Sequence, residues 1–267
     1  MARKSVGRRV LGSLVGLLAA YFAIAYVALP LAWTHHDRQP AITALKMRTH
    51  TSQGIPGDPI NIGAVGEKAA LLRAFAHAGW TPADPITLAS SLEIAESVVL
   101  HRPDDTAPVS PLFFDGRKQD FAFEKQVGGS ADRRHHVRFW KANKPAREGR
   151  PLWLGSATFD GGVGFSRYTA QITHHIGPDL DAERDFVIED LKRAGVVSEV
   201  YQISGSGPTP YGRNGEGDPY FTDGEVTVAV LRNAPAQDAA VTTPAPTYVA
   251  RKRLLFDVYR SIAHWIF

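Results

Sequence analysis

The chain contains no cysteine among its 267 residues. This absence excludes disulfide bonds, thiolate catalysis and cysteine-bound zinc or iron–sulfur centres. It also fits a bacterial periplasmic domain, where a stray thiol would be oxidised. The sequence likewise lacks a nucleotide-binding glycine loop before a helix, a Gly-x-Ser-x-Gly elbow and a His-Glu-x-x-His helix. The motifs of nucleotide-binding proteins, serine hydrolases and zinc proteases are therefore missing.

A large excess of positive charge is also missing from the central part of the chain. The whole chain has 30 Lys and Arg against 27 Asp and Glu, with a pI of about 9.1. Residues 1–33 hold four basic and no acidic groups, and residues 232–267 hold five basic and two acidic groups. Residues 34–231 therefore keep 21 basic and 25 acidic groups, a net charge of −4. The positive excess lies at the two ends, which favours membrane lipids over nucleic acid as a partner.

One long apolar run lies near the N-terminus. Residues 10–32 include no charged residue across 23 positions, and a helix of that length spans roughly 35 Å, enough to cross a bilayer. Arg3, Lys4, Arg8 and Arg9 precede it without an acidic neighbour. The positive-inside rule therefore predicts a single-pass protein of the bacterial inner membrane, with a cytoplasmic N-terminus and a periplasmic main domain. The alternative is a cleaved signal peptide, whose apolar region is usually only about 7–15 residues long.

The pattern after this run predicts one domain between two linkers. We expect a basic cytoplasmic N-terminus at 1–9, a transmembrane anchor at 10–33, a linker at 34–56, the domain at 57–231, a flexible linker at 232–248 and an amphipathic helix at 249–267. This last helix has Leu254, Val258 and Ile262 on one side. It is suited to a membrane interface, to packing on the domain or to contact with a second copy of the chain.

Periodicity within the domain predicts both helices and strands. Apolar spacing of helical type occurs at 67–79, 87–101 and 180–194, and Asp179 is placed to cap the last of these helices. Strands are predicted at 58–65, 112–116, 120–126, 135–140, 152–160, 170–176, 196–203 and 224–231, the second and third as a hairpin. The expected fold class is therefore α+β, with a mainly antiparallel sheet and about three helices, preceded by one transmembrane helix.

Two pairs of adjacent histidines lie in predicted strands, His135-His136 and His174-His175. Neighbouring side chains on a strand point to opposite faces, so each pair divides between two faces. His136 then shares a polar face with Arg138, and His175 lies on the polar face of its own strand. We expect His135 and His174 on the apolar faces, as core histidines satisfied by hydrogen bonds.

The polar faces define the candidate site. Asp160 and Arg167, in the predicted loop between these strands, complete the set of His136, Arg138 and His175. Two imidazoles and two guanidiniums suit an anionic phosphate or carboxylate, with histidine available for proton transfer. We expect neither a metal nor another cofactor, because strand geometry leaves only two histidines together. The alternative is that these residues share no role.

A glycine-rich segment at 205–224 offers a second candidate. It places Asn214, Glu216 and Asp218 at alternate positions, which calcium could use, but the spacing of a calcium-binding loop is incomplete. A long hairpin connection is the favoured interpretation.

The order of several long motifs resembles one known family, the LssY C-terminal domain family. The motifs are GDPINIG, GWTPADPITLASSLEIAESV, TAPVSPLFFDGRKQDFAFEK, GGSADRRHHVRFW, PLWLGSATFDGGVGFSR and THHIGPDLDAERDFV. The resemblance runs from about Gly57 to Leu231. It implies a bacterial envelope protein, since relatives often join this domain to membrane-spanning modules, some similar to DedA-type or phosphatidic-acid-phosphatase-type proteins. The family supplies no catalytic assignment, and this chain lacks the phosphatase module.

These observations support a functional hypothesis. We expect an accessory or ligand-binding module in envelope or phospholipid processes, which binds an anionic small ligand or a membrane-protein partner. The alternative is a hydrolase of phosphoesters or lipid headgroups with a His/Arg site.

Overall fold

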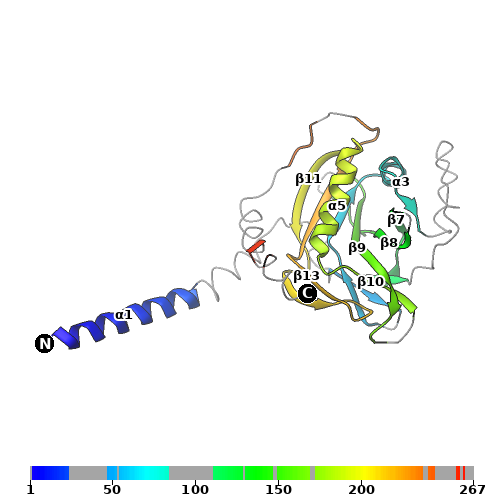
Figure 1. Ribbon diagram of the computed structural model, residues 1–267. Helices are drawn as coiled ribbons and strands as arrows, with labels where there is room; N and C mark the ends of the chain where they lie inside the picture. Colours follow the sequence, from blue (N-terminus) through cyan, green and yellow to red (C-terminus); the bar gives the residue numbers. More distant parts are fainter. Residues whose placement is uncertain are drawn as a thin grey trace.

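The fold is described here from a computed structural model (Figure 1). The described residues are 2–23, 47–52, 54–83, 111–128, 130–146, 149–168, 172–236, 240–243, 257–258 and 261. The predicted helix at 87–101 and nearly all of the predicted amphipathic helix at 249–267 lie outside them.

One large sheet forms the centre of the domain. Its strand order is β11 (Val197–Ser204), β14 (Glu225–Leu231), β3 (Ile62–Val65), β9 (Leu152–Phe165), β8 (Ser130–Lys141), β7 (Phe121–Val127) and β4 (Thr81–Pro82), and β10 (Ile172–Ile176) pairs with the far part of β9. Among these described strands only β14 and β3 pair in parallel. The expected α+β class with a mainly antiparallel sheet is confirmed.

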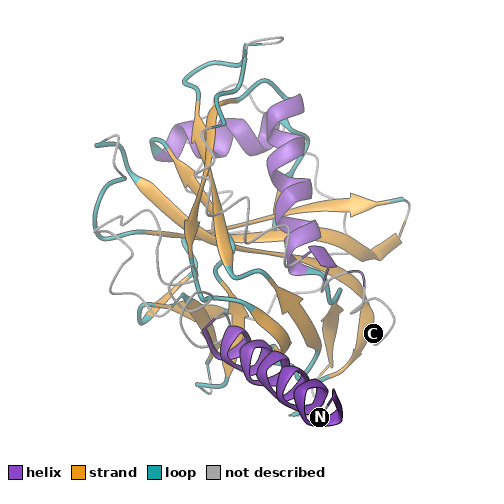
Figure 2. Cartoon of the chain, turned by 90° about the vertical axis from the view of Figure 1, so that its left-hand side faces the viewer, coloured by secondary structure: helices purple, strands orange, loops and turns teal. Residues whose placement is uncertain are grey.

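Two helices cover one face of this sheet. They are α3 (Lys68–His77) and α5 (Leu180–Arg193), which lie together in the upper part of the domain in Figure 2. Both begin and end close to the predicted positions, and the Asp179 carboxylate accepts the backbone N–H of Ala182, as expected for a cap. Their apolar side chains pack on the sheet in one cluster, which includes Leu71, Phe75, Val187, Leu191, Phe123, Val137 and Phe139.

A smaller sheet covers part of the opposite face. Its order is β2 (Pro56–Pro59), β1 (Arg48–Thr51), β5 (Leu112–Phe114) and β6 (Arg117–Lys118). A second apolar cluster fills the space between the sheets, with Met47, Ile60, Leu112 and Phe114 against Trp140, Leu152, Leu154, Val226 and Val228. A separate hairpin pairs β12 (Thr209–Arg213) with β13 (Pro219–Thr222). The glycine-rich segment is thus a hairpin, as favoured.

The pairing corrects two sequence predictions. The strand predicted at 58–65 is two strands in different sheets, because the chain leaves the small sheet at Ile60 and enters the large sheet at Ile62. The hairpin predicted between 112–116 and 120–126 is wrong. β5 turns at Asp115–Gly116 to pair with β6, whereas β7 pairs with β4 and β8. Local turn signals could not distinguish these partners.

The two segments expected as linkers contain ordered parts of the fold. β1 lies inside 34–56 and pairs with both β2 and β5. After β14, the backbone N–H of Thr242 donates to the Ser198 carbonyl and that of Val200 donates to the Thr242 carbonyl. Residues 240–243 therefore run along the outer edge of β11, and they protect that edge from pairing with another chain.

The N-terminal helix α1 covers Ala2–Ala23, which includes the first half of the predicted anchor. Residues 24–33 of that anchor lie outside the described residues. Within the part of the chain that the structure describes, no helix is both long and apolar enough to span a membrane.

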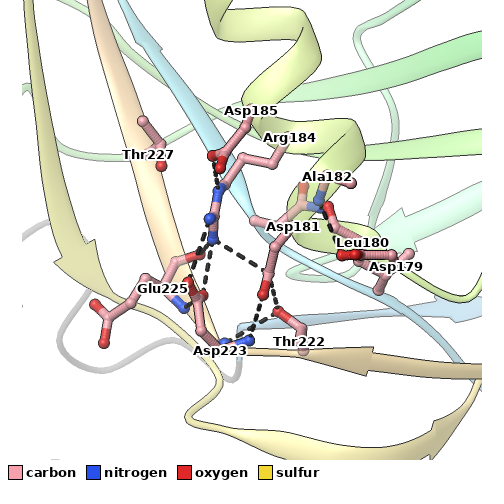
Figure 3. A network of polar contacts seen from close by, with 12 residues as sticks. Asp179, Leu180, Asp181, Ala182, Arg184, Asp185, Thr222, Asp223, Glu225 and Thr227 are labelled. Atoms are coloured by element: carbon pink, nitrogen blue, oxygen red, sulfur yellow. Dashed lines mark hydrogen bonds and ion pairs between the residues drawn. The ribbon is translucent and has the colours of Figure 1, made fainter. Parts of the chain in front are cut away.

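A buried ionic network fastens α5 to the hairpin and to β14 (Figure 3). Arg184 is fully buried and donates two hydrogen bonds to Asp223, with distances of 2.8 and 3.2 Å. It also donates to Asp181 at 3.2 Å and to Asp185 at 2.9 Å. Asp181 in turn accepts the Thr222 hydroxyl at 2.7 Å and the Asp223 N–H at 2.8 Å. The network fixes the N-terminal half of α5 against the chain at 222–225.

Candidate functional site

Alternation along β8 separates an apolar face from a polar one. Val137 and Phe139 enter the helix-covered core, whereas Arg134, His136 and Arg138 point to the opposite face. The register places Asp160, Thr158 and Ser156 of β9 directly beside these three residues, in that order. We call the following buried residues the polar cluster: Arg134, His136, Arg138, Ser156, Thr158, Asp160, Glu124 of β7 and Asp58 of β2.

One end of the polar cluster is an ionic triad centred on Arg134. Its Nη1 donates to Glu124 at 2.9 Å and its Nε donates to Asp160 at 3.0 Å. All three side chains are at most 6 % exposed. The Arg134 guanidinium is therefore already hydrogen-bonded to two carboxylates, those of Glu124 and Asp160, and it fixes their positions.

The other end is centred on Arg138. Its Nη1 lies 3.8 Å from Asp58 Oδ2, an ion pair too long for a hydrogen bond. Three buried atoms around it have no hydrogen-bond partner among the described residues: Asp58 Oδ1, Ser156 Oγ and His136 Nε2. Ser156 is the cross-strand neighbour of Arg138, and His136 precedes it by two positions on the same face. Such atoms are rare in folded proteins, and they indicate a place for a polar ligand or for ordered water.

Burial changes the protonation of these groups. It raises the pKa of Asp58 to about 6, and the nearby Arg138 charge opposes the shift only in part. Burial, followed by the positive charges of Arg138 and Arg134, holds the pKa of His136 well below its ordinary value. His136 is therefore a neutral imidazole at pH 7, and a proton binds to Asp58 far more readily than to an exposed carboxylate.

The Asp58 shift predicts how the stability of the fold depends on pH. Because its native pKa of about 6 exceeds the ordinary 3.8, Asp58 stabilises the fold most at low pH, and this contribution is lost as pH rises through 6. A shift of about two units corresponds to roughly 3 kcal/mol. Asp58→Asn should flatten the dependence of the unfolding free energy on pH by up to this amount, measured by urea unfolding between about pH 4 and 8.

The control for this prediction is the exposed Asp115, which lies in the β5–β6 turn. Asp115→Asn should keep the wild-type slope. Equal slopes for wild type and Asp58→Asn would contradict the proposed proton uptake at Asp58.

A second group of polar residues adjoins the polar cluster at Asp218. His175 Nδ1 lies 2.7 Å from Asp218 Oδ1, and the Ile176 N–H donates to the other oxygen at 3.1 Å. Arg167 Nε lies 3.8 Å from the same carboxylate. Asp218 is buried, whereas Arg167 is exposed. The Asp218 charge also raises the pKa of Asp58, which indicates that the two groups are close in space.

The structure therefore brings the five predicted site residues into two adjoining groups. His136, Arg138 and Asp160 belong to the polar cluster, and His175 and Arg167 surround Asp218. Asp160, predicted both as the last residue of the strand at 152–160 and as part of the loop that follows, lies within a strand, because β9 continues to Phe165 and pairs there with β10.

The other two histidines of the pairs have different environments. His135 lies against the core as expected, 2.8 Å from Glu183 and stacked on Phe186. The expected core position of His174 is wrong. Its Nδ1 lies 3.5 Å from Arg134 Nη2, on the side of the polar cluster. Alternation along one strand separates the two faces of β10 but does not tell which face meets the polar cluster, because that depends on the pairing of β10 with β9.

Several residues of the polar cluster had not been identified from sequence. Arg134 could have been found, since it continues the face of His136 and Arg138 at intervals of two. Asp58, Glu124 and Ser156 could not, because only strand pairing brings them to that face.

The hairpin between β12 and β13 uses its polar residues within the protein. The Asn214 side-chain oxygen accepts the backbone N–H groups of Glu216 and Asp218, which closes the turn. Asp218 binds His175. Across the described residues, no group of three or more His, Asp or Glu side chains is arranged to hold a metal ion. The residues that suggested calcium therefore shape the turn instead.

These observations define an α+β domain with a buried polar site between two sheets. The family model for the LssY C-terminus matches residues 41–226, and the chain belongs to this family. No curated protein and no solved structure matches the chain.

Proposed function

We propose that the domain is a ligand-binding module for a small molecule with a phosphate or carboxylate group, held at the Arg138 end of the polar cluster. The observation that carries this proposal is the group of three buried atoms without described partners: Asp58 Oδ1, Ser156 Oγ and His136 Nε2. A buried polar atom without a partner costs roughly 1–3 kcal/mol, so three together are expensive to keep without a ligand.

The charges at this end suit one anionic group. Arg134 donates to Glu124 and Asp160 at 2.9 and 3.0 Å, whereas the ion pair of Arg138 with Asp58 is long, at 3.8 Å. Protonation of Asp58, which its raised pKa favours, would remove the negative charge of this ion pair and so strengthen the attraction of Arg138 for an anion. A protonated Asp58 and the Ser156 hydroxyl can then donate to further ligand oxygens.

The proposed setting is the bacterial cell envelope. The charge-free run at 10–32 and the basic residues before it support a single-pass anchor with a cytoplasmic N-terminus and a periplasmic domain. The family resemblance supports a role in envelope or phospholipid processes. A phospholipid headgroup or its soluble phosphate would present the anionic group that the Arg138 end suits.

Binding is preferred over hydrolysis because of the surroundings of His175. Its imidazole is oriented by Asp218, as a general base would require. However, its hydrogen bond within the described structure goes to that carboxylate, and none joins it to a hydroxyl nucleophile. For the hydrolase alternative, the described structure therefore provides an oriented base, His175 with Asp218, but no nucleophile hydrogen-bonded to it.

The test is calorimetric titration of the full chain in detergent with inorganic phosphate and with glycerol 3-phosphate. Wild type should bind at least one of them. Ser156→Ala should weaken binding about fivefold, because a hydrogen bond contributes roughly 1 kcal/mol. Arg138→Gln should weaken it roughly 10- to 100-fold, as expected for a charged hydrogen-bonding group.

The matched control is Ser198→Ala on β11, where the hydroxyl donates to the Val230 carbonyl at 3.0 Å. This variant should lose stability but bind normally. Ser156→Ala should show the reverse pattern, since its hydroxyl has no described partner to lose. Failure of wild type to bind either probe, or unchanged binding by Ser156→Ala and Arg138→Gln, would overturn the proposal.

A further inference from the structure

Two segments meet at the end of the domain where β9 and the β12–β13 hairpin finish (Figure 1). The Arg167 N–H donates to the Glu216 carbonyl at 2.8 Å. The chain packs so closely here that a Cβ on Gly217 would lie 2.8 Å from Arg167 Cβ and 3.5 Å from the Tyr168 ring. Arg213 donates to the Gly217 carbonyl at 2.7 Å, and its guanidinium lies over the Tyr211 ring. These contacts join the two segments into one continuous surface.

We call this the tip surface, made of Phe165, Arg167, Tyr168, Tyr211 and Arg213. Its aromatic side chains are 68 %, 52 % and 56 % exposed for Phe165, Tyr168 and Tyr211. Apart from α1 and Val258, these are the only large hydrophobic side chains that the described residues expose. Exposed apolar groups gathered in one place mark an interaction surface more often than single ones do.

The charges of the tip surface have one dominant sign. Arg167 is 59 % exposed and Arg213 is also exposed. The nearest carboxylate, Asp218, is buried against His175, and Glu216 is only half-exposed. The outer layer therefore combines aromatic rings with guanidiniums. Tyrosine suits the boundary between water and lipid, and arginine suits anionic headgroups.

We infer that the tip surface docks on the surface of a bilayer that contains anionic phospholipids. The rings of Phe165, Tyr168 and Tyr211 enter the headgroup region, and Arg167 and Arg213 contact lipid phosphates. Its exposed side chains lie at the end of β9, just after it, and on β12, and this combination of exposed rings and guanidiniums suits the surface of a bilayer. This inference does not depend on ligand binding by the polar cluster.

The absence of cysteine allows a direct test. In the full chain, Tyr168→Cys and Tyr211→Cys each provide one site for an environment-sensitive fluorophore. Each labelled chain is reconstituted into lipid nanodiscs of phosphatidylglycerol or of phosphatidylcholine. Both labels should shift to the blue in phosphatidylglycerol discs and much less in phosphatidylcholine discs. The shift should diminish at about 1 M salt, where the screening length falls to ~3 Å.

The matched control is Arg193→Cys at the C-terminal end of α5, where the side chain is 65 % exposed. The residue before α5, Asp179, pairs with Phe221 of β13, and a helix of 14 residues is roughly 20 Å long, so this label lies about that far from Phe221. It should not respond to lipid composition.

Removing charge tests the role of the two arginines. Arg167→Gln with Arg213→Gln should abolish the difference between the two kinds of disc at either label, while circular dichroism confirms the fold. Labels at 168 and 211 that respond no more than the label at 193 would overturn the inference. A blue shift that appears only after a second protein is added, and not with anionic lipid alone, would overturn the inference as well.

Discussion

Arg184→Ala should reduce the unfolding free energy by roughly 3–5 kcal/mol, the cost of leaving buried carboxylates without their cation. Arg184 is fully buried and contacts Asp181 and Asp223, which are buried with it. The pKa of Asp181 is already raised to about 6, chiefly by burial, while the Arg184 charge opposes the shift. Without that charge the pKa must rise further, so the loss of stability should be larger near pH 8 than near pH 5.

Urea unfolding at both pH values measures this effect. Asp185→Asn is the matched control, because the Asp185 side chain is 38 % exposed although it also accepts from Arg184. That variant should cost less than about 1 kcal/mol. Arg184→Lys should recover only part of the stability, since an ammonium cannot reproduce the two-point contact with Asp223. A loss that is small, or that does not change with pH, would contradict the role of the network.

Arg134→Met should have an effect of similar size, roughly 3–5 kcal/mol, because it leaves Glu124 and Asp160 buried without the guanidinium between them. The methionine fills much of the arginine volume, so the loss would report charge rather than a cavity. The same urea unfolding measurement at neutral pH checks it.

The sharper comparison is a triple variant that neutralises the whole triad: Arg134→Met, Glu124→Gln and Asp160→Asn. If uncompensated charge causes the loss, this variant should be more stable than Arg134→Met alone, even though it carries two further substitutions. A triple variant as unstable as the single one would show that Arg134 stabilises the fold by packing instead.

Local periodicity was sufficient to predict much of the fold. Helical spacing predicted α3 and α5, and Asp179 was identified as a cap, because these features depend on residues within one or two turns of each other. The position of His136 and Arg138 on one face followed from alternation along β8. The proposed position in the cell envelope is supported by the apolar run at 10–32, and the proposed anionic ligand is supported by the polar cluster.

The tertiary structure decided which groups meet. Asp58 contacts Arg138, which is 80 positions further along the chain, and Asp218 contacts His175 across a separation of 43. No local pattern encodes these contacts, because they depend on how strands from separate segments pair and in which register. His174 illustrates this dependence, since the pairing of β10 with β9 decides which face of the sheet its side chain occupies, and that face carries Arg134. The sequence by itself thus determined which classes of chemistry are excluded, through the absence of cysteine, and which local helices and strands form, through its periodicity. Long-range strand pairing determined which residues make up the polar cluster, and their burial there determined their protonation.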